Sequence, residues 1–397
     1  MFKKSPTLEW GFLKEIIVGY WSDYQIQMHE KPALLSINKT ICSDCVKDEF
    51  LSNLVIQNLC SNRCSYCLNT SENMIATNYD VVMQQVYKAI LLQYQDAQNS
   101  NMPYVEKGWL FDQIYVEDIF FDFDPGWSNE LLNDLISSAD PSWYLVSCIE
   151  GDWATLSEHD VLLYGWENFK EQVLYKTRYL FLNQKGSNQY QEIPVASMLN
   201  ELARLCTDLK LVKEIPEGTV FFRVRSHSDA EPFKTFNDVG VAPRGIASAG
   251  RMNPAGISYF YVAYDEATAT NEVITDQDHW SIAKFRLKQK ISVIDFSNIP
   301  ILPSQFDVNA FKLREKIHFL HDFVDDLSQP VQKDGREHID YVPTQIISEF
   351  FRYGFEPKIK GIKYQSIKHK DGLNIAFFES DNVELEKLFE LVCITGN

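Results

Sequence analysis

The sequence predicts an α+β protein, with a mostly helical N-terminal part followed by a compact module of mixed or antiparallel strands flanked by helices. Apolar residues recur at helical spacing through residues 79–94, 157–183 and 194–211. After residue 218 the pattern changes to short alternating segments such as TVFFRVRS, which are typical of strands. No regular strand–helix–strand succession follows, so a doubly wound parallel sheet is not expected.

The length of 397 residues exceeds what one hydrophobic core usually serves, so more than one domain is expected. The polar, turn-rich stretch at 183–194 is predicted to be a hinge. The sequence predicts four parts: an N-terminal segment with a cysteine knuckle at 1–72, a helical domain at 73–210, a strand-rich domain at 211–385 and a C-terminal tail at 386–397.

The formal net charge of −18 argues against a protein that binds nucleic acid or anionic membranes through a general basic surface. An acidic protein that binds a polyanionic ligand should instead gather a few arginines at one place. No apolar run reaches the length of a membrane span, and the N-terminal residues lack the apolar core of an export signal. The expected setting is therefore the cytoplasm.

Five of the eight cysteines fall between residues 42 and 67, where Cys42 with Cys45 and Cys64 with Cys67 form two C-x-x-C pairs. The stretch between the pairs predicts a short helix. Each pair can place two thiolates on one tetrahedral cation, so the spacing predicts a structural zinc site. Cys60 could replace one ligand, and buried or redox cysteines are the alternative interpretation. The isolated cysteines are expected to be small apolar fillers: Cys148, Cys206 and Cys393.

In the strand-rich module, Asp265 is predicted to cap a helix that carries Glu272 about two turns later. Helices are also expected at 305–327 and at 341–354, where Pro343 suits a first turn and Gly354 a stop. The predicted strands lie at 219–226, 256–263, 281–287, 291–296, 361–366 and 373–378.

The string GRMNPAGISYFY at residues 250–261 places an arginine just before an Asn-Pro turn and then enters an aromatic strand. A surface turn needs no arginine there. The Asn253–Pro254 turn and Gly256 are expected to fix the backbone so that Arg251 faces a cleft at the mouth of the strand. Close approach of a ligand is expected at the glycine.

The motifs FFRVR, GRMNPAGISYFYVAYDEATATNEV, YVPTQIISEFF and GIKYQS with GLNIAFF, in this order, closely resemble the RES domain family over about residues 210–380. The family is named for an arginine, a glutamate and a serine, which here correspond to Arg251 (with Arg223), Glu272 and Ser366. The front half, with its cysteine pairs and YGWENFKEQVLYKTRYLF, resembles the helical, HEPN-like domain often fused to RES domains.

The resemblance implies a fold similar to ADP-ribosyltransferases and an activity that consumes NAD. Some family members degrade NAD by hydrolysis or phosphorolysis, and others are proposed to ADP-ribosylate a protein. Many are toxins held by an antitoxin, and similar proteins occur in anti-phage defence. The expected partners are therefore NAD+, an antitoxin or inhibitory protein, a phage-derived trigger and a second copy of the chain.

The matching residues suit cleavage of the bond between nicotinamide and ribose. Arg223 and Arg251 would clamp the pyrophosphate of NAD through paired charge-assisted hydrogen bonds. Glu272 would stabilise the oxocarbenium-like charge that develops on the ribose. Tyr261 would pack its ring on nicotinamide or ribose, and Ser366 would hydrogen-bond the ribose or the nicotinamide amide.

Other functions stay open at this stage. Taken singly, each of these residues also has an ordinary explanation. The arginine could be exposed to solvent, the glutamate could lie on a helix surface, and the tyrosine could be an ordinary strand residue. The acceptor of the ADP-ribosyl group is water, phosphate or a protein side chain. In a HEPN-type ribonuclease an arginine is followed four to six residues later by a histidine, and the helical front half contains no such pair. The one match, Arg314 and His321 with six residues between them, lies inside the RES-like region and is interpreted as a chance match. A non-catalytic binding module is the third class.

Overall fold

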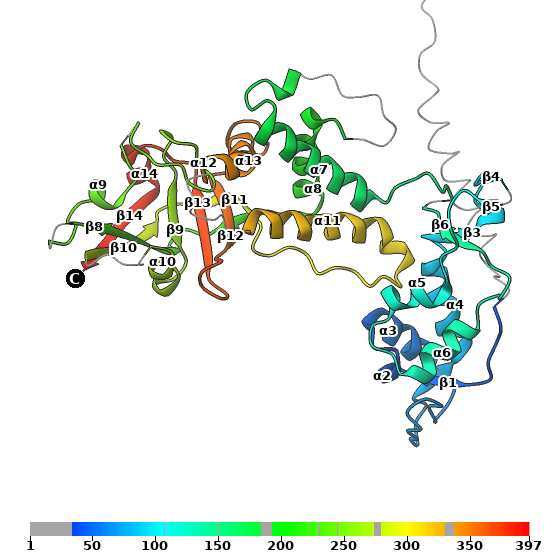
Figure 1. Ribbon diagram of the computed structural model, residues 1–397. Coiled ribbons are helices and arrows are strands. Elements are labelled where there is room, and N and C mark those ends of the chain that lie inside the picture. Colours follow the sequence, from blue (N-terminus) through cyan, green and yellow to red (C-terminus); the bar gives the residue numbers. More distant parts are fainter. Residues whose placement is uncertain are drawn as a thin grey trace, which may run out of the picture. The chain divides into compact units, whose positions relative to one another are not determined.

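The computed structural model describes residues 34–106, 108–149, 151–183, 193–228, 231–243, 245–273, 279–329 and 337–396 (Figure 1). Its internal contacts divide the chain into two compact units. The first comprises residues up to Ser157 with Pro303–Arg314, and the second comprises Glu158–Leu302 with Glu315 onward. The predicted hinge at 183–194 lies almost entirely outside the described residues, and the four domain limits given above stay predictions.

The first unit is mostly helical, with three short two-stranded sheets that pair β1 with β2, β3 with β6 and β4 with β5. The side chain of Asp48 caps the predicted helix between the cysteine pairs by accepting from the Leu51 backbone at 2.9 Å. The elements are β1 Thr40–Cys42, α2 Ser43–Val46, α3 Glu49–Gln57, β2 Ala76–Asn78, α4 Tyr79–Ile90, β3 Tyr94–Asp96, η1 Ala97–Asn99, β4 Tyr104–Val105, β5 Gly108–Trp109, α5 Val116–Phe123, α6 Asn129–Ser137, β6 Leu145–Ser147 and η4 Val308–Ala310.

The second unit combines helices with one large sheet. Its first helical elements are α7 Glu158–Tyr175, η2 Phe181–Asn183, η3 Val195–Ser197 and α8 Met198–Asp208. Its strands are β7 Val212–Ile215, β8 Val220–His227, β9 Phe260–Ala263, β10 His279–Leu287, β11 Ile291–Asp295, β12 Gly361–Gln365, β13 Leu373–Phe377 and β14 Phe389–Gly396. The helices among and after the strands are α9 Phe236–Val239, α10 Glu266–Val273, α11 Phe311–Ser328, α12 Glu337–Asp340, α13 Val342–Tyr353 and α14 Asn382–Leu388.

The eight strands form one mixed sheet in the order β14-β10-β8-β9-β13-β12-β11-β7. β11 and β12 run parallel, and the other neighbours run antiparallel. The α+β class and the helix-flanked mixed sheet are therefore confirmed. The sequence analysis did not predict β7 or the edge strand β14, which falls within 386–397. The aromatic strand begins at Phe260, several residues later than predicted.

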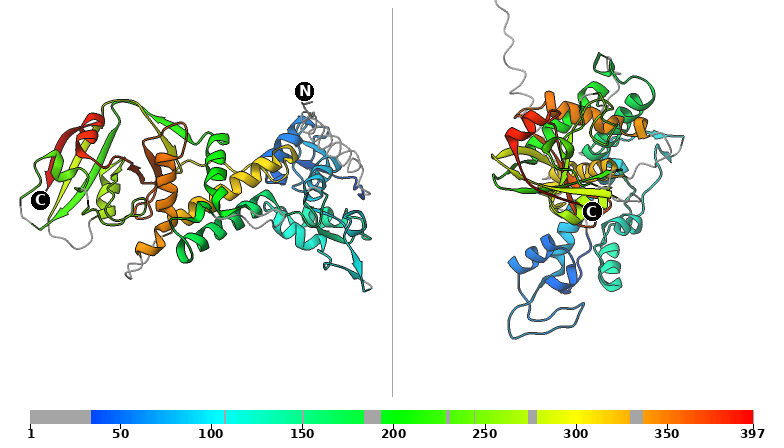
Figure 2. Two further views of the ribbon diagram at one scale, coloured as in Figure 1. Left: turned by 90° about the horizontal axis from the view of Figure 1, so that it is seen from above. Right: turned by 90° about the vertical axis from the view of Figure 1, so that its left-hand side faces the viewer.

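Helices cover the sheet on both faces. Buried residues of α7, α8, α11 and α13 pack in one cluster with Ile294, Ile362 and Ala376 of the strands. Buried residues of α9 and α14 pack in a second cluster with Phe221 and Phe285. The left view of Figure 2 shows strands between the orange helix α13 and the red helix α14. Among the described residues, no helix is both long and apolar enough to cross a bilayer.

The isolated cysteines divide into two groups. Cys148 and Cys206 are fully buried, as expected of small apolar fillers. Cys393 is exposed on β14, so the filler prediction is wrong there. The reason is that β14 is an edge strand whose outer positions face solvent, which the local sequence did not indicate.

The predicted cap of α10 is present and yields a stability prediction. Asp265 accepts from the Thr268 backbone at 2.7 Å and from its hydroxyl at 2.6 Å. Burial opposes ionisation of Asp265, but the hydrogen bonds from Thr268 outweigh it and lower its pKa below 3.8. Asp265→Ala should therefore cost about 0.5–2 kcal/mol of unfolding free energy at pH 7, measured by urea denaturation.

The pH dependence has a definite sign. Because the folded-state pKa of Asp265 is lowered, its contribution is complete above the unfolded value and is lost as the pH falls through the folded value. The difference between wild type and Asp265→Ala should therefore shrink in acid. Asp325→Ala, on the exposed side of α11, is the control and should change little. Equal stability of Asp265→Ala and wild type at pH 7 would contradict the capping role.

Candidate functional site

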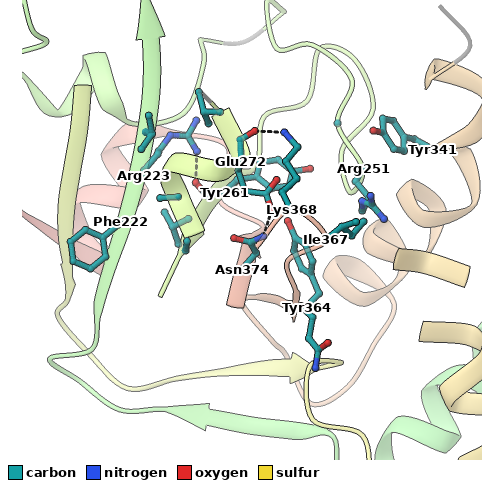
Figure 3. Close-up of a pocket in the computed structure, with 17 residues that line it drawn as sticks. Phe222, Arg223, Arg251, Tyr261, Glu272, Tyr341, Tyr364, Ile367, Lys368 and Asn374 are labelled. Atoms are coloured by element: carbon teal, nitrogen blue, oxygen red, sulfur yellow. Dashed lines mark hydrogen bonds between the residues drawn. The ribbon is translucent and has the colours of Figure 1, made fainter. Parts of the chain in front are cut away.

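A cavity of about 420 Å³ opens in the second unit where β8 and β9 separate (Figure 3). These neighbouring strands are paired at one position, Phe222 opposite Ala263. The cavity lies within the range of about 300–1,000 Å³ usual for small-molecule sites. Its walls come from β8, β9, α10, the loop before β9 and the strands β12 and β13 with the turn that joins them.

Arg223 is a largely buried cation on the β8 wall. Its Nη1 donates to the Tyr261 carbonyl at 2.6 Å, and its guanidinium lies 5.2 Å from the centre of the Phe260 ring. Its buried Nε has no hydrogen-bond partner among the described residues. Burial, together with the neighbouring Arg225 guanidinium, lowers the pKa of Arg223. A bound anion would offset both effects, because it supplies an acceptor and an opposite charge.

Arg251 also lines the cavity, on the far side of Glu272 from Arg223 in Figure 3. Its Nη1 donates to the Leu327 carbonyl at the end of α11, and its own carbonyl accepts from the Thr344 hydroxyl of α13. The expectation that Arg251 stands at the mouth of a strand is therefore wrong. It belongs to a loop that two helices hold against the cavity.

The hydroxyl of Tyr261 holds the turn after Arg251. It donates to Asn253 Oδ1 at 2.7 Å and accepts from the Met252 backbone at 3.0 Å. A Cβ on Gly250 would lie 2.5 Å from Asn253 Oδ1, so this glycine is required by close packing. Gly256 has open space around it and a φ of +86°, so its role in the fold is conformational, and the close approach of a ligand there stays a prediction.

Two side chains fix the carboxylate of Glu272 on α10. Ser366 Oγ and Asn374 Nδ2 each donate to Glu272 Oε1 at 2.7 Å. Lys368 Nζ donates to the Glu272 backbone carbonyl at 2.5 Å. Glu272 lines the cavity, whereas Ser366 does not. Ser366 therefore acts on the cavity indirectly, by holding the carboxylate of Glu272.

The polar cavity residues that the sequence analysis missed include Lys368 and Asn374. Asn374 is 5% exposed on β13, at a position that alternation along the predicted strand could have flagged as inward-facing. Lys368 lies in the turn after β12, where no local pattern marks it. Among the described residues that line the cavity, Lys368, Arg223 and Arg251 supply three cations and Glu272 supplies the one carboxylate. The cavity therefore suits an anionic ligand, although the chain carries a net charge of −18.

Comparison with protein-family models matches residues 220–390 to the RES domain. The second half of the chain is a RES domain. Residues 57–187 match the HEPN/RES N-terminal domain 1, so the suspected family is confirmed for both parts. The RES family comprises toxin-like, NAD-related proteins. A search of curated proteins found no match, and a search of solved structures found none either.

Within the RES domain, the cavity contains four of the five residues predicted for NAD, namely Arg223, Arg251, Tyr261 and Glu272. The histidine of the ribonuclease-like match lies elsewhere, with His321 Nε2 3.1 Å from the Pro300 carbonyl. Arg314 Nη1 donates to the Pro303 carbonyl at 2.5 Å. Each side chain of that pair thus contacts the backbone of the preceding loop, which gives them a structural explanation.

The four cysteines of the two C-x-x-C pairs lie together in the first unit. Cys42 Sγ is 3.6 Å from both Cys45 Sγ and Cys67 Sγ, and Cys45 Sγ is 3.8 Å from Cys64 Sγ. Four thiolates at about 2.3 Å from a tetrahedral zinc are about 3.8 Å apart, so these residues fit the ion. The exposed Cys60 is not among them, and its proposed substitution for a ligand is wrong.

Without a cation, burial raises the pKa of Cys42 to about 11 and raises that of Cys45 further. Burial also opposes ionisation of Cys64, but backbone hydrogen bonds from Cys67 and Tyr66 lower its pKa to about 7. A zinc ion binds thiolates and would draw all four into the ionised form. Zinc here would be structural, since protein supplies every ligand.

Replacing Cys42 by serine should remove zinc and destabilise the first unit. The expected result is a loss of about one zinc ion per chain by elemental analysis and a lower melting temperature, because the metal crosslinks segments that are distant in sequence. Cys60→Ser is the matched control and should retain the metal. Protein purified without chelator that contains no zinc would contradict the site, as would equal loss in both variants.

Proposed function

We propose that the RES domain cleaves the nicotinamide–ribose bond of NAD+, by hydrolysis or phosphorolysis. The observation that carries the proposal is the Glu272 carboxylate, which Ser366 and Asn374 hold in one orientation at a cavity lined by three cations. Such a site suits a substrate whose negative charge lies on a pyrophosphate and whose reacting ribose becomes positive.

In the reaction the bond between the ribose carbon C1 and the pyridinium nitrogen breaks, and its electron pair leaves with nicotinamide. Nicotinamide leaves as a neutral molecule, so the leaving group needs no proton. The ribose then carries oxocarbenium-like charge, which the Glu272 carboxylate stabilises in the transition state. Addition of water gives ADP-ribose and a proton, and addition of phosphate at the same carbon gives the 1-phosphate of ADP-ribose.

The cations act on binding and orientation. The buried Nε of Arg223 has no partner in the described part of the chain, and a pyrophosphate oxygen would satisfy it. Arg251 would hold the same group from the opposite wall, with its direction fixed by the end of α11. The ring of Tyr261 lines the cavity and can contact nicotinamide or ribose, while its hydroxyl is committed to the turn at Asn253. Ser366 is then a positioning residue for Glu272.

We further propose that the protein acts in the cytoplasm as a toxin, in a toxin–antitoxin or anti-phage setting. Rapid loss of NAD would harm the cell that makes the enzyme, so an antitoxin or inhibitory partner must restrain it until a trigger such as a phage component arrives. Assembly as a homodimer remains part of this proposal.

The direct test is incubation of the purified full chain with NAD+, in buffer with and without phosphate, followed by chromatography. Hydrolysis predicts nicotinamide and ADP-ribose in both buffers, whereas phosphorolysis predicts release that depends on phosphate. ADP-ribosyl transfer would be identified if nicotinamide release required an added protein. In that case NAD labelled in its adenosine part would leave the label on that protein. No nicotinamide under any of these conditions would overturn the proposal in favour of a binding module.

Glu272→Gln should separate binding from chemistry. The amide keeps the shape but loses the charge, so turnover should fall by about two to three powers of ten while the affinity for NAD changes only a few-fold. Nicotinamide release and calorimetric titration measure the two quantities. Glu266→Gln, an exposed change on the same helix, is the matched control and should keep wild-type turnover. Equal turnover of the two variants would exclude Glu272 from the reaction.

A further inference from the structure

A third cluster of ligand-type side chains lies in the second unit, apart from both the cavity and the cysteines. His159 stands at the start of α7, and His318 and Asp322 stand on α11. One ligand atom from each lies within 4.8 Å of the others. His318 and Asp322 are four residues apart, so one turn of helix brings them to the same face. The same spacing joins metal-binding pairs on the helices of zinc enzymes.

The contacts around His159 are those of a metal ligand. Its Nε2 lies 2.7 Å from Asp322 Oδ2, and its Nδ1 lies 3.3 Å from Asp160 Oδ1. Its ring stacks on that of His318, with centres 4.1 Å apart and planes 16° apart. A hydrogen bond between His159 and Asp322 is enough to explain why these two side chains lie together. His318 places a second imidazole beside this pair, in the same small volume.

We propose that His159, His318 and Asp322 bind a divalent transition-metal ion such as Zn²⁺. Two neutral imidazoles and a carboxylate are a ligand set that zinc accepts, with a fourth position for water. Asp160 would hold the other nitrogen of His159, as carboxylates commonly do behind metal-bound histidines.

The surrounding charge favours a cation. Glu315, 9% exposed, places Oε2 3.4 Å from the His159 backbone nitrogen. Asp160, Glu315 and Asp322 thus put three carboxylates around two imidazoles. The neighbouring Glu158 pairs with two cations, Lys316 at 3.6 Å and Arg204 at 4.0 Å.

The ion would crosslink the start of α7 to α11, where Glu315 and Lys316 of α11 also contact α7. Further along, Trp166 Nε1 donates to Asp326 Oδ2 at 2.8 Å, and Lys170 pairs with the same carboxylate at 3.0 Å. α11 ends at Ser328, and the carbonyl of the preceding Leu327 accepts from Arg251. Metal binding should therefore stabilise this helix pair, and the test does not depend on any NAD reaction.

The experiment measures zinc bound by the full chain after equilibration with Zn²⁺ and desalting. Asp322→Asn and His318→Gln should each hold about one ion fewer than Asp325→Asn, the matched change at an exposed position of the same helix. Titration with Zn²⁺ should show at least a tenfold loss of affinity for that ion in both variants, the usual effect of removing a ligand or its support. Co²⁺ charge-transfer absorption from thiolates should stay unchanged, because it reports the cysteine site alone.

The His318→Gln variant keeps the test valid if Asp322→Asn fails to fold, because it leaves the contact between His159 and Asp322 in place. Circular dichroism melts with EDTA present should be similar for His318→Gln and Asp325→Asn, and the two should diverge when Zn²⁺ is added. The proposal is overturned if His318→Gln binds as much zinc as Asp325→Asn with the same affinity. It is also overturned if wild type holds no zinc beyond the thiolate site.

Discussion

The separation of β8 from β9 is the constraint on which the rest of the site depends. After the single pair of Phe222 with Ala263 the two strands no longer continue a ladder, and the guanidinium of Arg223 donates to the Tyr261 carbonyl beside the gap. A buried carbonyl needs a donor, so a long cationic side chain suits this position. The same guanidinium leaves Nε buried and unpartnered beside an open cavity. The opening between β8 and β9 thus provides the space of the cavity, and Arg223 beside it provides the positive charge.

The remaining groups are held by elements that are distant in sequence. α10, capped by Asp265, carries Glu272 to the cavity. Ser366, in the turn after β12, and Asn374, on β13, fix its carboxylate. The loop of Arg251 depends on α13 and on the end of α11. A fixed carboxylate and fixed cations cost little reorganisation when charge develops on a substrate, which is how preorganised sites accelerate reactions.

Local pattern was enough for the α+β class, for most strands and for the cap at Asp265, because alternation and capping are short-range properties. The ordered motifs also brought Arg223, Arg251 and Glu272 to notice. The orientation of Ser366 toward Glu272 could not be predicted, because it depends on a contact across 94 residues. The same holds for the loop of Arg251, whose partner Thr344 is 93 residues away. His159 and His318 meet across two helices, and no spacing in the sequence links them.

The central claim is that NAD binds in the cavity between β8 and β9 with its pyrophosphate on Arg223. Calorimetric titration of NAD into Glu272→Gln protein, which is expected to turn over slowly, measures this directly. Adding Arg223→Ala should weaken binding by about tenfold or more, since hydrogen bonds to a charged group contribute about 1.5–3 kcal/mol. Adding Arg225→Ala, from the same strand but outside the cavity, should leave affinity within about twofold. Equal affinity in the two double variants would contradict the account.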